Sequence, residues 1–125
     1  MATFHDLQDA VSTVCAEHGY EVFGRFPGGR AWEIVAVRTV TIPELDEDHR
    51  YQTEAGLHHQ LGDSLRRTTK RLGHRATWHG EVKTTGLGDG RNEVVCSWVG
   101  SPARLTDLEI HSIIAGVLRG VYKRE

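Results

Sequence analysis

Apolar side chains recur with helical spacing in three segments of the chain. In residues 4–18 they appear every three or four positions, and Thr3 and Asp6 are placed as a capping pair before them. In residues 51–72 one face carries Tyr51, Ala55, His58, Leu61, Leu65, Thr69 and Leu72. A third segment starts at a capping box on Thr106 and carries Ile110, Ile113, Ile114, Val117, Leu118, Val121 and Tyr122. The pattern therefore predicts three amphipathic helices.

The segments between these helices have the pattern of strands. Residues 20–26 and 32–42 are rich in β-branched and aromatic side chains and are joined by a Pro-Gly-Gly turn. Residues 76–83 alternate between apolar and polar, and a glycine-rich turn joins them to the partner strand over residues 92–99. Two β-hairpins are expected, one after each of the first two helices.

The resulting order αββαββα predicts an α+β fold in which a four-stranded antiparallel sheet packs against three helices. A chain of 125 residues is the usual size of one domain and can bury about two-thirds of its unfolded surface, so we expect a single domain over residues 1–125. The apolar faces of the elements should meet in one core. Its expected members are Leu65, Trp78, Trp98, Ile114 and Val117.

Composition narrows the functional classes. No apolar run approaches the roughly 20 residues that cross a bilayer, and the chain does not open like a signal peptide, so a cytoplasmic protein without membrane contact is expected. Cys15 and Cys96 fall within a helix and a strand pattern, which favours buried free thiols over a disulfide. His58 and His59 point about 100° apart on a helix and cannot easily share a metal. We expect neither a metal nor a cofactor.

The formal net charge is −2, so any case for nucleic-acid binding depends on a local patch. The densest basic segment lies at the end of the second helix and continues into the following strand. Its candidate binding residues are Arg67, Lys70, Arg71, Arg75, Trp78 and His79. These could meet phosphates while the indole stacks on a base. They could equally complement the negative end of the helix, whose first turn is acidic. The sequence leaves both interpretations open.

Short segments resemble the pterin-4a-carbinolamine dehydratases, small proteins whose four-stranded antiparallel sheet carries three helices on one side. Residues 71–74, followed by Trp78, are similar to the family's helix end and its histidine-rich stretch, and residues 92–94 and 105–110 to its last strand and final helix. The resemblance implies that His74 is a catalytic candidate. Arg75 and Ala76 replace the family's second histidine and its proline, and its third histidine is absent, which implies a scaffold that has lost the activity.

The leading hypothesis from the sequence is a non-enzymatic protein-binding domain that acts as an adaptor, an inhibitor or an assembly factor. It depends on the exposed mixed face of one strand and on the wide apolar stripe of the last helix. The partner would be another protein, or a second copy of the chain in a homo-oligomer. The alternatives are a nucleic-acid-binding module that uses the basic helix end and a divergent dehydratase-like enzyme.

Overall fold

A computed structural model describes residues 3–28, 31–43 and 47–120. The elements are α1 (Phe4–Glu17), β1 (Glu21–Gly28), β2 (Ala31–Pro43), α2 (Glu47–Arg71), β3 (Thr77–Gly86), β4 (Arg91–Ser101) and α3 (Asp107–Leu118). The predicted αββαββα order and α+β class are confirmed. Two residues of the expected last stripe, Val121 and Tyr122, lie outside the described residues, as does the side chain of Tyr51.

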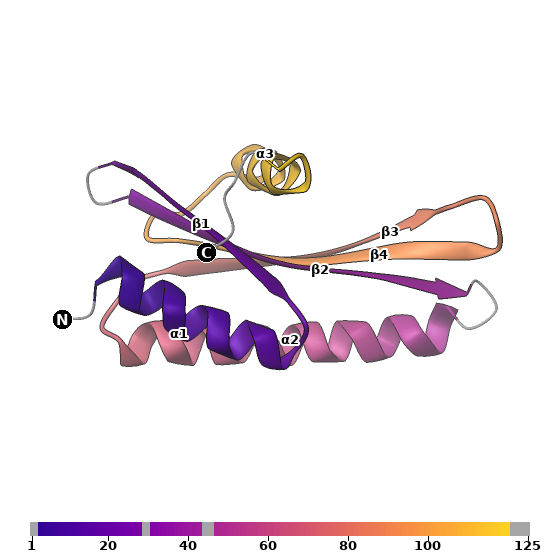
Figure 1. Ribbon diagram of the computed structural model, residues 1–125, viewed down its shortest axis with the longest axis horizontal. Coiled ribbons are helices and arrows are strands. Elements are labelled where there is room, and N and C mark those ends of the chain that lie inside the picture. The colour runs from indigo at the N-terminus through magenta and orange to yellow at the C-terminus, as the bar shows by residue number, and fades with distance from the viewer. Residues whose placement is uncertain (1–2, 29–30, 44–46, 121–125) are drawn as a thin grey trace.

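The four strands form one antiparallel sheet with the spatial order β1-β2-β4-β3. The long strands β2 and β4 lie at its centre, where Ile34 pairs with Gly100 and Ile42 with Asn92. Each hairpin therefore contributes one central strand and one edge strand. The same arrangement is visible in Figure 1, where β3 and β4 extend together as a long hairpin.

The helix ends follow their local sequence signals. At the start of α1 the backbone N–H of Asp6 donates to Thr3 Oγ1 at 3.1 Å, and the N–H of Thr3 donates to Asp6 Oδ2 at 3.0 Å. The pair Thr106 and Glu109 caps α3 in the same way. Gly73, whose φ is +78°, follows the end of α2 in the left-handed conformation that glycine adopts without strain. Both predicted capping boxes are confirmed.

The helices lie on both faces of the sheet. In Figure 1, α1 and α2 cover one face, and α3 crosses the other. The expectation of one core is therefore wrong: Leu65, Trp78 and Trp98 belong to a large core under α1 and α2, whereas Val117 belongs to a smaller one under α3. Ile114 is partly buried and packs against this smaller core.

The sheet is covered on both faces because successive strand residues point to opposite faces and β4 carries apolar residues on both of them. The one-sided layout implied by the resemblance is not found.

Two indole rings in the large core lie against glycines of the neighbouring strand. Trp98 is the register partner of Gly80, and Trp78 is the partner of Gly100. A Cβ atom at Gly80 would lie 2.7 Å from the Trp98 ring, and one at Gly100 would lie 2.6 Å from the Trp78 ring. Trp98 also lies against Gly62 of α2. The glycines leave the space that the two rings fill.

The same substitution at two glycines of α2 should therefore have opposite effects. A methyl group at Gly62 collides with the Trp98 ring, so Gly62→Ala should lower the free energy of unfolding by about 1–3 kcal/mol. Gly56 is exposed and has open space where its Cβ would lie, so Gly56→Ala should raise stability by about 0.5–1 kcal/mol. Urea denaturation measures both, and equal effects would contradict the close packing of Trp98 on α2.

Candidate functional site

The surface around α3 carries exposed apolar side chains. Leu108 is 79% exposed and Leu118 is 57% exposed, both on α3. Leu87, in the turn between β3 and β4, is the third large hydrophobic side chain exposed among the described residues. Within the described chain, α3 is the only helix on its face of the sheet. We call the outer side of α3 and the hollow beside it the α3 surface.

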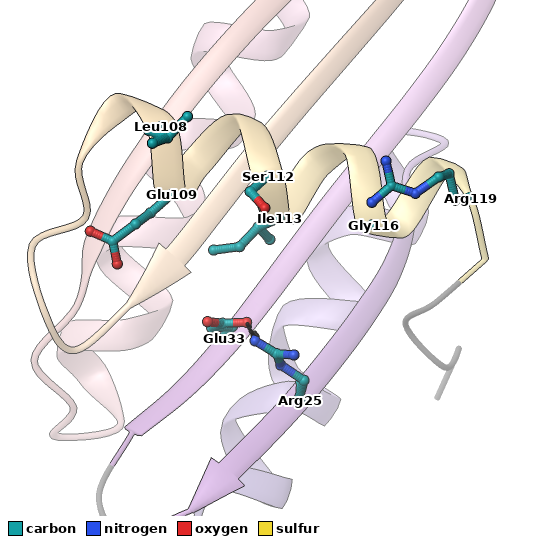
Figure 2. A pocket seen from close by; sticks show the side chains of 8 residues that line it. All are labelled: Arg25, Glu33, Leu108, Glu109, Ser112, Ile113, Gly116 and Arg119. Carbon is teal, nitrogen blue, oxygen red and sulfur yellow. Dashed lines mark hydrogen bonds and ion pairs between the residues drawn. The ribbon is translucent and has the colours of Figure 1, made fainter.

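A hollow of about 490 Å³ lies between α3 and the first hairpin (Figure 2). Its lining residues are Arg25, Glu33, Leu108, Glu109, Ser112, Ile113, Gly116 and Arg119. On the strand side, Arg25 Nη2 forms an ion pair with Glu33 Oε2 at 3.0 Å. The hollow thus combines apolar side chains with charges of both signs. Such a mixture is typical of surfaces that bind proteins.

The six predicted binding residues at the basic end of α2 do not form one surface. Lys70 and Arg75 line a hollow of about 380 Å³ between α2 and β3, together with Trp78. Arg67 and Arg71 are exposed on α2 and do not line it. His79 follows Trp78 in β3, so the two side chains point to opposite faces of the sheet.

The burial of Trp78 conflicts with the stacking role expected of it. The side chain is 6% exposed, and its Nε1–H donates to Thr69 Oγ1 at 3.0 Å. The ring is therefore packed in the large core and cannot stack on a base. Arg66 belongs to the same basic segment of the sequence but was not among the six candidate binding residues, and it lines the same hollow.

His74, the catalytic candidate, lies in the link between α2 and β3. Its backbone N–H donates to Thr69 O at 3.1 Å and so closes the end of α2. Its half-buried ring lies edge-on to Trp32, with 6.3 Å between the ring centroids. Helix capping and ring packing are thus among the contacts that hold His74. In the described part of the chain, no group of three or more histidine, cysteine or acidic residues could hold a metal ion.

His58 is the centre of a buried polar cluster that joins α2 to the sheet. Its Nδ1 lies 2.7 Å from the hydroxyl of Tyr20, and its ring stacks on Trp98 at a centroid distance of 4.7 Å. Its backbone carbonyl accepts the indole N–H of Trp98 at 3.0 Å. Burial, with a smaller contribution from the charge of His59, lowers the pKa of His58 to about 4. His58 is thus a buried histidine with one bonded ring nitrogen.

The two cysteines are free and buried, as expected. Burial raises the pKa of Cys15 to about 12, and it also raises the pKa of Cys96. Both thiols are therefore protonated at neutral pH, and neither supplies an accessible thiolate nucleophile.

Comparison of the chain with protein-family models, with curated proteins and with solved structures gives no match. Among the helices of the described residues, none is long and apolar enough to cross a membrane.

The buried neutral imidazole of His58 should make stability depend on pH. Its pKa is about 4 in the folded chain, against a reference value of 6.5, so the unfolded chain takes up this proton first. The contribution of the neutral His58 to the free energy of unfolding should be fully present above pH 6.5 and should be lost as the pH falls from 6.5 to 4. From pH 7 to pH 4 we expect the chain to lose about 2–3 kcal/mol more than His58→Gln does, in urea denaturation followed by tryptophan fluorescence. An identical pH dependence of the two proteins would contradict this assignment.

Purified protein should leave the rate of carbinolamine dehydration unchanged. His74 is the only counterpart of the family's histidines, so one group would have to both accept and donate protons. A spectrophotometric dehydration assay against a buffer blank measures this. Acceleration by orders of magnitude that His74→Ala abolishes would show that the chain is an enzyme.

Proposed function

We propose that the chain is a non-enzymatic protein-binding domain that engages a partner protein through the α3 surface. The observation that carries this proposal is the exposure of Leu108, which leaves 79% of a large apolar side chain in water beside a hollow. Burying one leucine side chain is worth about 1.5–3 kcal/mol, so a partner that covers Leu108 gains a substantial part of its binding free energy there.

The position of α3 supports this role. The apolar side of α3 packs against the sheet, where Ile110, Ile113 and Val117 are buried. Leu108 and Leu118 therefore do not contribute to the described core, and a contact outside this core would have to cover them. The ion pair of Arg25 with Glu33 gives the strand side of the hollow a fixed polar pattern, which favours a partner with complementary charges.

The chemistry of the titratable groups supports a non-enzymatic role. His58 is neutral and 6% exposed, and the thiols of Cys15 and Cys96 are protonated in the core. Two free thiols also favour action in the cytoplasm, where thiols are kept reduced. An adaptor, an inhibitor and an assembly factor all need a stable surface of this kind, and a second copy of the chain is one partner that it could bind.

Photocrosslinking tests the α3 surface directly. A photoreactive amino acid in place of Ser112, which is exposed and lines the hollow, should crosslink one protein in the cells that make this chain. With the purified partner, Leu108→Glu should weaken binding by about tenfold to a hundredfold, because it puts a charge where a leucine is buried.

The matched control is Leu87→Glu, at an exposed leucine outside the α3 surface, and it should leave binding unchanged. Equal loss in both variants, or full affinity in Leu108→Glu, would contradict the proposal.

A further inference from the structure

The hollow between the end of α2 and the start of β3, here called the α2–β3 groove, is lined by cationic side chains from three positions. Arg66 lies inside α2, Lys70 in its last turn, and Arg75 in the link that leads to β3. His74 also lines the groove, and no lining residue is acidic. In a chain of net charge −2 this is a local concentration of positive charge.

Complementing the negative end of α2 does not account for all of these cations, because only Lys70 lies in the last turn. The carbonyl of Lys70 already accepts the N–H of Gly73 at 3.0 Å, and the carbonyl of Thr69 accepts the N–H of His74 at 3.1 Å. Backbone amides thus already satisfy these two carbonyls of the last turn. Arg66 lies more than one turn before the helix end and Arg75 lies beyond it, whereas the dipole effect is confined to the terminal turn. Among ion pairs between described residues, none involves Lys70 or Arg75.

The floor and one wall of the groove are fixed in place. Thr69 Oγ1 donates to Leu65 O at 2.7 Å and accepts the indole N–H of Trp78, which holds the floor. The guanidinium of Arg66 lies 5.2 Å from the centroid of the Trp98 ring. It also pairs with Asp63 at 3.4 Å, at a site that is half exposed and outside the groove lining. Groups held in this way lose little conformational entropy when a ligand binds.

We propose that the α2–β3 groove binds the phosphate group of a small phosphomonoester. Lys70 and Arg75 pair with no carboxylate among the described residues, and together with Arg66 they suit a dianion, which accepts charge-assisted hydrogen bonds from several cations at once. The groove volume of about 380 Å³ lies at the lower end of the range for small-molecule pockets, about 300–1,000 Å³. Ala76, Trp78 and Pro102 provide an apolar part of the lining for the organic portion of the ligand.

A small ligand fits this arrangement better than a nucleic-acid strand. A strand would need cations that follow its backbone and an aromatic face for stacking. Here Arg67 and Arg71 lie outside the groove, and the ring of Trp78 is buried. A phosphomonoester and a nucleic-acid strand both carry phosphate groups, so the experiment must distinguish binding of one from binding of the other.

The test uses the full chain and compares two double variants that each remove two positive charges from the region around the end of α2. Phenyl phosphate is titrated into isotopically labelled protein, and amide chemical shifts are followed. We expect saturable shifts at Lys70, Arg75 and Thr77, and affinity at least about tenfold weaker in Lys70→Ala/Arg75→Ala. Arg67→Ala/Arg71→Ala is the matched control and should bind like the original chain.

Three results would overturn the proposal. Equal weakening in both double variants would show diffuse attraction to a basic surface. Tight binding of a single-stranded oligonucleotide without any response to phenyl phosphate would identify nucleic acid as the ligand. The absence of shifts with either probe would leave the groove without a phosphate ligand. If the alanine variant fails to fold by circular dichroism, Lys70→Gln/Arg75→Gln takes its place. None of these results bears on the α3 surface, which lies on the other face of the sheet.

Discussion

The packing of Trp98 between α2 and the sheet is the contact on which most of the described structure depends. Its ring lies against Gly62 on the helix and Gly80 on the edge strand, and its N–H is bonded to the carbonyl of His58. The same ring stacks on the imidazole of His58 and lies under the guanidinium of Arg66. One side chain therefore sets the distance of α2 from the sheet and positions both a buried polar cluster and a cation of the surface.

The two proposed sites occupy the two sides of the sheet because the sheet is apolar on both. The large core leaves α2 with a polar outer side and a basic end, and the groove forms where this end meets β3. On the other side, α3 lies alone within the described chain, so its outer side and the hollow beside it are open to solvent. A protein surface and a phosphate site could thus act independently on one small domain.

Features that depend on local sequence could be predicted, and features that depend on long-range packing could not. The capping boxes at Thr3 and Thr106 and the stop at Gly73 involve residues three or four positions apart, so the sequence reveals them. The side of the sheet that α3 covers was missed, because the short link after β4 could direct the helix to either face. The nearly continuous apolar run from Val94 to Val99, broken by Ser97, was the available signal, since a strand covered on both faces loses its alternation.

The candidate sites were harder to predict than the fold. The basic residues were recognised as a cluster, but their division between the groove and the open surface depends on where β3 returns beside α2. The hydrogen bond between Tyr20 and His58 spans 38 positions, and no sequence pattern links the two residues.

The small core under α3 has a dynamic consequence. Its few apolar contacts should make α3 the first part of the described fold to open, so amide hydrogens should exchange faster there than in the layer formed by α1 and α2.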